Sequence, residues 1–317
     1  MKVVLPRKLI PGDFIGVVSP ASPPIGEKKH GYKIGLSYLQ NKGYRVLEGR
    51  FVQNQQGYLA GTDDQRALDF NAMLTNPEIK AIFCSRGGYG TPRLLERIDY
   101  RAARKSPKII VGYSDITALQ MALYARSRLV TFSGPMVAVD LNDGTHNFTD
   151  QSLWDIITKP ATAKIEFADL DESVKIYSNG SAKGRLLGGC LSVISAMLGT
   201  SYLPRFKNSI LFLEDVGEDV YKIDRYFAHL YYSGILKQIK GLVLGQFINS
   251  TGSSTTETDT EFDQIISKYT GNLGIPVVGH FPYGHGKIKL TLPIGGKVKL
   301  DTFSGSLEIM EPVINEK

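Results

Sequence analysis

The sequence has few of the residues that build metal sites or disulfide frameworks. Its 317 residues include two cysteines, Cys84 and Cys190, and five histidines, with no CxxC or HxxxH spacing. Two cysteines that lie far apart in apolar segments are expected to be buried free thiols. This pattern supports neither a disulfide framework nor a zinc site.

Long apolar runs are also absent. No window approaches the ~18 apolar residues of a membrane-spanning helix. The apolar stretch near the N-terminus is interrupted by Pro6 and Arg7, so it is too short for the core of a signal peptide. We expect a cytoplasmic protein with no membrane partner.

Basic residues are in excess, but they are scattered. The formal net charge is +6, and the clusters are short, as at Arg101, Arg104 and Lys105. Nucleic-acid-binding surfaces concentrate basic residues and interleave them with aromatic rings. The sequence lacks that pattern, which argues against a nucleic-acid partner and is compatible with a small anionic substrate.

In the first half of the chain, short apolar runs alternate with segments of helical periodicity. Strands are predicted at 15–18, 44–47, 81–84 and 108–111, and helices at 27–42, 62–74, 92–98 and 116–126. The segment Thr62-Asp63-Asp64-Gln65 has the pattern of a capping box that opens the second of these helices. Strands that alternate with helices favour a parallel sheet covered on both faces. We predict an N-terminal α/β domain over residues 1–140, followed by an interdomain connection over the turn-rich stretch 141–181.

The second half predicts a mixed α/β (α+β) domain over residues 182–317. Strands are expected at 209–213, 242–245 and 276–279, helices at 188–198 and 221–234, a closing hairpin at 297–300 and 306–310, and a polar loop at 250–258.

Reactive side chains follow three of these apolar runs. Ser114 stands between a strand and a helix, where a hydroxyl would project from the carboxyl edge of the sheet, although an N-cap serine explains the pattern as well. Glu214 directly follows an apolar run and could orient a histidine; a solvated loop acid is the alternative. His285, flanked by glycines, suits a general base, with His280 as its rival.

A glycine-rich segment, Ser85-Arg86-Gly87-Gly88-Tyr89-Gly90, follows the strand at 81–84. Its glycines would let backbone amides approach a ligand closely, and Arg86 could clamp a carboxylate. The segment matches neither a dinucleotide-binding fingerprint nor a P-loop.

Five blocks, in order along the chain, resemble the LD-carboxypeptidase family of serine peptidases. They are residues 85–90, 111–119, 188–192, 212–225 and 284–295, which read SRGGYG, VGYSDITAL, GGCLS, FLEDVGEDVYKIDR and GHGKIKLTLPIG. The likeness runs from about Gly12 to Leu300 and so covers nearly the whole chain.

This resemblance implies a two-domain serine peptidase with its active site between the domains. It maps the nucleophile onto Ser114, the acid onto Glu214 and the base onto His285. It implies that the reaction needs no metal ion, and we expect no other cofactor. It also implies backbone oxyanion donors at Asp115 and Gly88, and we expect Arg86, Gly87 and Tyr89 to contact the substrate.

The family usually removes the terminal D-alanine from murein tetrapeptides in the cytoplasm, during recycling of the cell wall. It also contains immunity peptidases that hydrolyse microcin-type peptidyl-nucleotide conjugates, and the triad does not distinguish the two substrates. A non-catalytic peptide-binding protein is a further alternative. Trp154, the only tryptophan, could stack on a nucleobase or pack in the core. A homodimer is compatible with the sequence.

Overall fold

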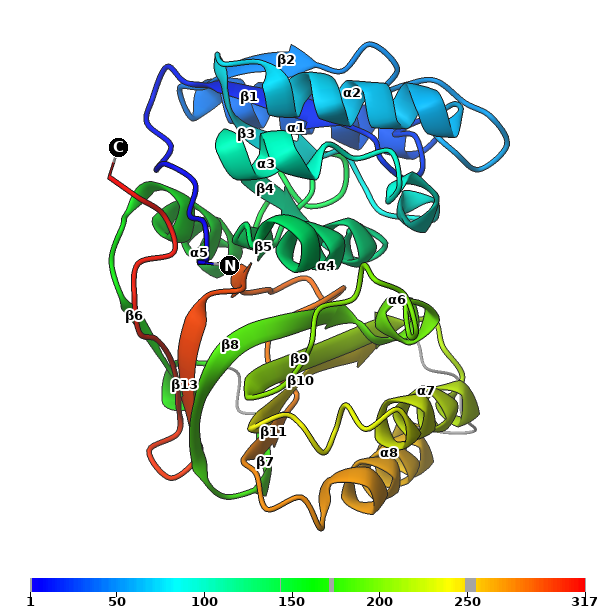
Figure 1. Cartoon of the computed structure of the whole chain (residues 1–317), viewed down its shortest axis with the longest axis vertical. Helices are drawn as coiled ribbons and strands as arrows, with labels where there is room; N and C mark the ends of the chain where they lie inside the picture. Colours follow the sequence, from blue (N-terminus) through cyan, green and yellow to red (C-terminus); the bar gives the residue numbers. More distant parts are fainter. Residues whose placement is uncertain (1, 143, 171–173, 249–254, 317) are drawn as a thin grey trace.

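The computed structural model describes residues 2–142, 144–170, 174–248 and 255–316. Two β-sheets, each with its own helices, lie one above the other along the long axis of the molecule (Figure 1). This arrangement is the mixed α/β, two-domain architecture that the sequence predicts.

The N-terminal sheet has six strands in the order β12-β5-β4-β3-β1-β2. Five strands pair in parallel, and the sixth, β12, adds an antiparallel edge from far along the chain. The parallel pairing is as predicted, whereas β5 and β12 are not among the predicted strands. Their bounds are β1 Phe14–Val18, β2 Arg45–Glu48, β3 Ile79–Cys84, β4 Ile109–Gly112, β5 Thr131–Ser133 and β12 Leu292–Ile294. The carboxyl ends of the parallel strands therefore share one edge of the sheet.

Helices cover both faces of this sheet. Side chains of α1 (Lys28–Asn41) and α5 (Asn147–Thr158) pack against Val17 and Phe83 on one face. Those of α2 (Asp63–Thr75) and α3 (Tyr100–Lys105) pack with Ile82 and Ile110 on the other. Strand side chains alternate between the two clusters, as the period of two in a pleated strand requires.

Two local predictions in this half have different outcomes. The capping box at the start of α2 is confirmed, because Thr62 accepts from the amide of Gln65 and the Gln65 side chain accepts from the Thr62 amide. The helix predicted at 92–98 is wrong. A short 3₁₀ helix (Thr91–Leu94) occupies its first turn, and α3 then starts afresh where the Asp99 side chain caps the Ala102 amide.

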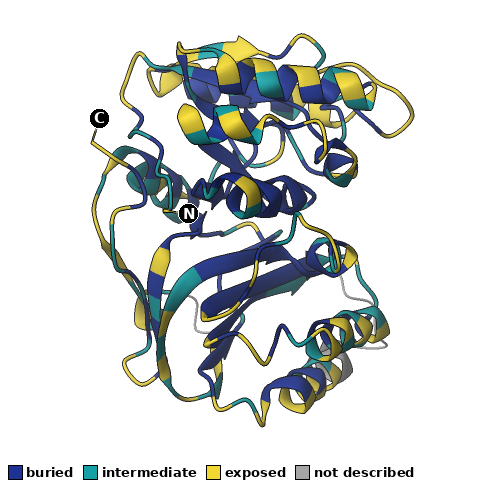
Figure 2. Cartoon of the chain, viewed as in Figure 1, coloured by how far each residue is buried: buried dark blue, intermediate teal, exposed yellow. Residues whose placement is uncertain are grey.

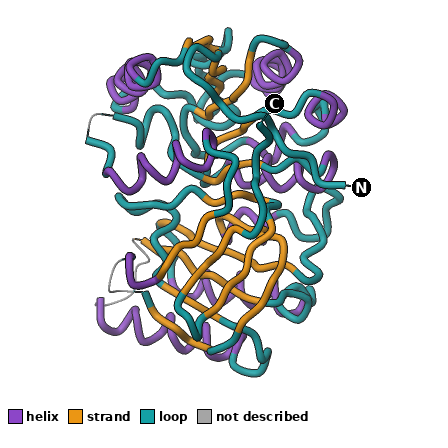
Figure 3. Tube along the Cα trace, turned by 90° about the vertical axis from the view of Figure 1, so that its left-hand side faces the viewer, coloured by secondary structure: helices purple, strands orange, loops and turns teal. Residues whose placement is uncertain are grey.

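The second sheet has eight strands in the order β6-β14-β13-β8-β9-β10-β11-β7. Its four central strands are parallel, β8 Ser181–Cys190, β9 Ser209–Val216, β10 Gly241–Ile248 and β11 Val277–Gly279. The outer strands are antiparallel, β6 Ala163–Glu166, β7 Lys175–Ser178, β13 Lys297–Asp301 and β14 Ser306–Ile309. The predicted closing hairpin is therefore confirmed as β13 and β14. Figure 3 shows the strands of the second sheet as the broad orange layer in the lower half of the molecule.

Two helix and loop predictions in this half need correction. Gly188 and Gly189 end β8 instead of opening a helix, and α6 (Leu191–Ala196) begins only after them. A Cβ at Gly188 would lie 1.8 Å from the carbonyl oxygen of Phe212, so glycine is needed there for close strand packing. Of the loop predicted at 250–258, residues 250–254 lie outside the described residues, and 255–258 belong to α8 (Thr255–Thr270).

The stretch predicted as a connection carries structure of its own. Residues 141–181 hold α5, β6, β7 and a 3₁₀ helix (Phe167–Asp169), and α5 packs on the N-terminal sheet while β6 and β7 form the edges of the second one. Within the ranges that the structure describes, no helix is both long and apolar enough to cross a membrane.

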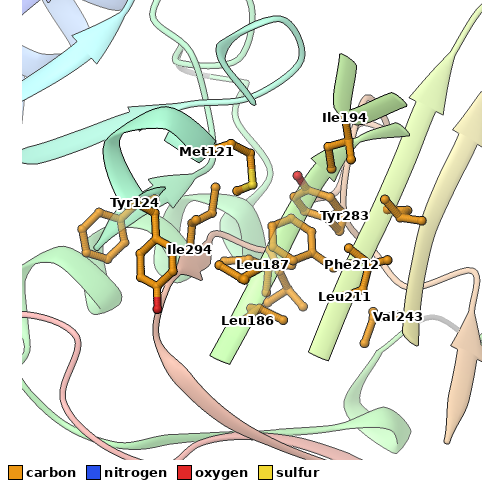
Figure 4. Close-up of a cluster of buried hydrophobic side chains, with 14 of the residues drawn as sticks. Met121, Tyr124, Leu186, Leu187, Ile194, Leu211, Phe212, Val243, Tyr283 and Ile294 are labelled. Atoms are coloured by element: carbon orange, nitrogen blue, oxygen red, sulfur yellow. The ribbon is translucent and has the colours of Figure 1, made fainter. Parts of the chain in front are cut away.

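A shared hydrophobic core joins the two sheets. Figure 2 shows that the central strands of both sheets are largely buried. Figure 4 shows Met121 and Tyr124 of α4 (Ile116–Ser127) beside Leu187 of β8 and Phe212 of β9, with Ile294 of β12 between them. Packing of α4 on β8 fixes the helix that follows β4 against the second sheet.

Candidate active site

Ser114 lies on a tight turn between β4 and α4. Its backbone is left-handed, with φ of 63°, a conformation that costs energy for any residue with a Cβ. Gly112 allows this tight approach, because a Cβ there would lie 3.0 Å from Ile116 and 3.1 Å from Cys84. The N-cap alternative is wrong: α4 has Asp115 at that position, with no side-chain cap. The Ser114 hydroxyl is therefore directed to another partner.

Glu214 lies within β9 and is fully buried. Its neighbour Asp215 is 2% exposed and accepts from the amide of Ser192 at 2.7 Å, which anchors the first turn of α6. Neither acid is a solvated loop residue, so that alternative is wrong for Glu214.

His285 connects these two residues. Its Nδ1 lies 2.6 Å from Glu214 Oε2, and its Nε2 lies 3.0 Å from Ser114 Oγ. The rival, His280, directly follows β11, and the structure places His285 rather than His280 at Ser114. The three residues predicted as nucleophile, base and acid are thus brought together from three distant segments.

Glycines on both sides of His285 make this geometry fit. A Cβ at Gly284 would lie 2.6 Å from Glu214 Oε2, and one at Gly286 would lie 1.8 Å from Gln246 Oε1. Gly284 also has a φ of 113°, which residues with a Cβ rarely adopt. The flanking glycines therefore let the carboxylate and Gln246 pack directly against the histidine loop.

Burial differs along this chain of hydrogen bonds. The Glu214 side chain is fully buried, whereas that of His285 is 17% exposed. Burial raises the pKa of Glu214, and the hydrogen bond from His285 partly offsets that effect. A buried carboxylate that faces one ring nitrogen fixes the tautomer of the imidazole, while the other nitrogen stays accessible.

Two hydrogen bonds join the second half of the chain to α4 and β5 near the nucleophile. The amide of Cys190, at the end of β8, donates to Thr117 Oγ1 at 3.1 Å. The hydroxyls of Ser133 in β5 and Tyr283 lie 2.8 Å apart. Both contacts join chain segments on either side of the site and are buried.

The glycine-rich segment lies against Ser114. A Cβ at Gly87 would be 2.9 Å from Ser114 Cβ and 3.6 Å from the amide nitrogen of Asp115. Among the described residues, the amides of Asp115 and Gly88 donate to no backbone carbonyl. Free amides beside a nucleophile are suited to hold a developing oxyanion, so the predicted role of these two amides stays a prediction with compatible geometry.

A buried polar cluster that the sequence analysis missed clamps this segment to the nucleophile turn. The Asp115 carboxylate accepts from the amide of Thr91 at 2.8 Å, and the Thr91 hydroxyl donates to the Asp115 carbonyl. Arg66, 1% exposed, donates to the carbonyls of Gly90, at 2.9 Å, and Pro20. No local signal in the sequence marks these partners.

Gly87→Ala is expected to lower turnover about 100-fold, because the new methyl group would displace the Ser114 side chain. The measurement is steady-state hydrolysis by the purified variant, with circular dichroism to verify folding. Gly57→Ala is the control: its Cβ meets nothing within 4 Å, although φ of 60° makes it the more strained substitution. Equal activity of wild type and Gly87→Ala would contradict the placement of this segment at the site.

Asp115 is expected to make the protein less stable as pH rises from about 4 to about 6. Burial raises its pKa from 3.8 to about 6, so the folded state holds a proton that the unfolded state has lost in this window. Asp115→Asn should therefore gain stability relative to wild type across it, by up to about 3 kcal/mol. Urea unfolding at pH 4, 5, 6 and 7 measures this difference, and a difference that does not change with pH would contradict it.

The residues expected to contact the substrate are spread along the same loop. The Arg86 guanidinium lies 3.5 Å from the carbonyl of Pro23, and the exposed ring of Tyr89 makes an edge contact with Tyr58 at 5.7 Å. Their part in substrate binding stays a prediction. Trp154 stacks on Tyr44, with ring centroids 5.0 Å apart, and donates to the hydroxyl of Tyr38, so its ring is used in packing.

The part of the chain that the structure describes contains no group of three or more His, Cys, Asp or Glu side chains able to hold a metal ion. The side chains that the structure brings together at the site are the serine, the histidine and the buried carboxylate. A hydroxyl bonded to an imidazole that is itself held by a carboxylate is the arrangement of nucleophilic acyl transfer.

Comparison with known sequences identifies two matching profiles. One, described as the LD-carboxypeptidase N-terminal domain, matches residues 15–134, and the other, the LD-carboxypeptidase C-terminal domain, matches residues 183–300. A probable murein peptide carboxypeptidase of Bacillus subtilis is 36% identical over 299 residues, which cover 94% of this chain and 91% of the relative.

A second relative and two solved structures extend the comparison. The microcin C7 self-immunity protein MccF of Escherichia coli is 29% identical, over 98% of this chain and 97% of its own. A structure of an MccF active-site mutant superposes with a TM-score of 0.91 at 27% identity, over 98% of this chain and 100% of that one. The muramoyltetrapeptide carboxypeptidase of Oxalobacter formigenes gives 0.81 at 32% identity, over 93% and 97%.

Proposed function

Since this chain belongs to the LD-carboxypeptidase family and is a serine peptidase of that type, we propose that it hydrolyses the L,D peptide bond to the terminal D-alanine of murein tetrapeptides through Ser114, His285 and Glu214. The observation that carries the proposal is the pair of hydrogen bonds from His285, at 3.0 Å to Ser114 and 2.6 Å to Glu214.

In the first half-reaction, His285 Nε2 takes the proton of Ser114 Oγ as this oxygen attacks the scissile carbonyl. Glu214 holds the imidazole in its working tautomer and stabilises the imidazolium that forms. We assign the oxyanion to the amides of Asp115 and Gly88; loss of one such donor typically costs 10²–10³-fold in turnover. The C–N bond then breaks, and His285 returns the proton to the departing amine of D-alanine.

In the second half-reaction, water hydrolyses the ester that joins the tripeptide to Ser114. His285 accepts a proton from that water and passes it to Ser114 Oγ as the ester bond breaks. The products are D-alanine and a tripeptide with a free carboxylate. We propose Arg86 as the residue that binds the carboxylate of the terminal D-alanine, because a guanidinium holds a carboxylate with two parallel hydrogen bonds.

Murein peptides are favoured over microcin-type conjugates by the higher identity to relatives named for murein peptides, 36% and 32% against 29% and 27% for MccF. Trp154, the only tryptophan, is packed on Tyr44 in this chain. Hydrolysis of a peptidyl-nucleotide conjugate is the second candidate, supported by the TM-score of 0.91 to MccF. A non-catalytic peptide-binding protein would need no ordered Ser–His–Glu set.

The cellular role follows from the resemblance to the family: we propose recycling of murein peptides in the cytoplasm. Purified protein should be incubated separately with a murein tetrapeptide, with its epimer ending in L-alanine, and with a peptidyl-nucleotide conjugate. Release of D-alanine from the first substrate alone supports the proposal. Hydrolysis of the conjugate alone would replace it with the second candidate.

A further inference from the structure

A buried ion pair lies behind the histidine loop and takes no part in the proposed chemistry. The side chain of Lys289 is 3% exposed and that of Asp140 is 11% exposed, and the two form a salt bridge. They come from chain segments 149 residues apart, Asp140 after the N-terminal sheet and Lys289 between His285 and β12. A buried ion pair is costly to form unless its geometry and hydrogen bonds are good.

Both members of this pair are held in place. Asp140 Oδ2 accepts from the amide of Met136 at 2.9 Å. The backbone amide of Lys289 donates to Thr149 Oγ1 on α5, also at 2.9 Å. The amide of the next residue, Leu290, donates to the carbonyl of Pro282 at 2.7 Å, which closes the base of the loop that carries His285. Lys289 is therefore one of the residues that attach this loop to the N-terminal domain.

Tyr113 connects the ion pair to the histidine. The Lys289 ammonium donates to the Tyr113 hydroxyl at 3.0 Å and lies 4.3 Å from the centre of its ring. The same ring makes a T-shaped contact with the His285 imidazole, with centroids 5.0 Å apart and planes at 70°. Tyr113 also directly precedes Ser114 in the chain, so the residue next to the nucleophile contacts the ring of the base.

We propose that Lys289, paired with Asp140, is a positioning residue that fixes the Tyr113 ring against His285 and thereby holds the imidazole between Ser114 and Glu214. The steady-state test of this inference rests on the proposed function, because it measures turnover of the proposed substrate. None of the three residues needs to contact the substrate. Hydrogen bonds to Ser114 and Glu214 fix the ends of the imidazole, and the ring of Tyr113 limits its tilt.

Lys289→Met tests this role, because methionine keeps most of the volume and removes the charge. A small misplacement of a catalytic group can cost about 100-fold in rate, and we expect kcat to fall 10- to 100-fold while KM stays within about twofold of wild type. Lys299→Met is the matched control: Lys299 pairs with Asp301 on β13 and β13 lies outside the site, so its kcat should be that of wild type.

The double variant Asp140→Asn/Lys289→Met separates positioning from stability. Lys289→Met alone leaves a buried carboxylate without its cation, which lowers the melting temperature. The double variant removes that unpaired charge, so its melting temperature should recover while kcat stays low. Recovery of kcat together with the melting temperature would show a purely structural role and overturn the inference, as would an unchanged kcat or a loss confined to KM in Lys289→Met.

A second readout keeps the inference testable if the proposed substrate is wrong. A fluorophosphonate reacts with an activated serine without a peptide substrate, so its rate with Ser114 reports the alignment of His285. If wild type releases no D-alanine yet is labelled, the substrate assignment fails, and labelling 10- to 100-fold slower in Lys289→Met still supports the positioning role. Equal labelling rates in the two proteins would overturn it.

Discussion

Ser114→Ala is expected to lower turnover on a murein tetrapeptide by a factor on the order of 10⁴–10⁶. The substitution removes the only oxygen that lies within hydrogen-bond distance of His285 Nε2, at 3.0 Å, among the described residues. Without it, no acyl-enzyme can form, and only binding and oxyanion stabilisation of direct water attack remain. D-Alanine release, measured by a coupled amino-acid oxidase assay, gives the rate.

The Ser114→Ala variant is expected to fold as wild type does. Alanine at φ of 63° keeps the backbone strain that serine already has, and the serine caps no helix. Ser304→Ala, on the exposed turn between β13 and β14, is the matched control and should leave the rate unchanged. A Ser114→Ala protein that releases D-alanine at a tenth of the wild-type rate or more would rule out this nucleophile.

Glu214→Gln is expected to lower turnover by about 10⁴-fold. The carboxylate lies 2.6 Å from His285 Nδ1 and is fully buried, so no water can replace it. The amide that takes its place carries no charge to stabilise the imidazolium, and its NH₂ group can favour the wrong tautomer. Single-turnover rates at saturating substrate measure this loss, and KM should change little, because Glu214 does not reach the solvent.

Asp215→Asn provides the comparison for Glu214→Gln. Asp215 is the adjacent residue and is buried as well, but its carboxylate faces the Ser192 amide and the Cys190 thiol instead of His285. This variant should lose stability more than turnover. If the two variants show the same loss of turnover, the effect belongs to the strand end in general, and the special role of Glu214 is contradicted.

Much of the fold could be predicted from local patterns. The apolar runs before Ser114 and Glu214 are strands because they are buried on both faces, and the capping box at Thr62 marks a helix start that the structure reproduces. The glycines at 188 and 189 misled the prediction, because glycine before an apolar run can open a helix or let two strands approach. Only the contact with Phe212 decides between these readings.

The site was predictable only in part, for a physical reason. The segment around Ser114, taken alone, is explained equally well by an N-cap serine. The resemblance of five ordered blocks to the family is what selected Glu214 and His285 as its partners. The matching blocks identify individual catalytic candidates, whereas the contacts that support these residues depend on the tertiary structure. Lys289 meets Asp140 and Arg66 meets Gly90 only because distant segments fold together, and no local periodicity carries that information.

Labelling with a fluorophosphonate, followed by mass mapping, tests the central claim most directly. We expect one adduct per chain, located on Ser114, and labelling at least 100-fold slower in His285→Ala, because the serine is weakly nucleophilic without its base. Labelling of a different residue, or equal rates in wild type and His285→Ala, would contradict the assignment of Ser114 as a nucleophile activated by His285.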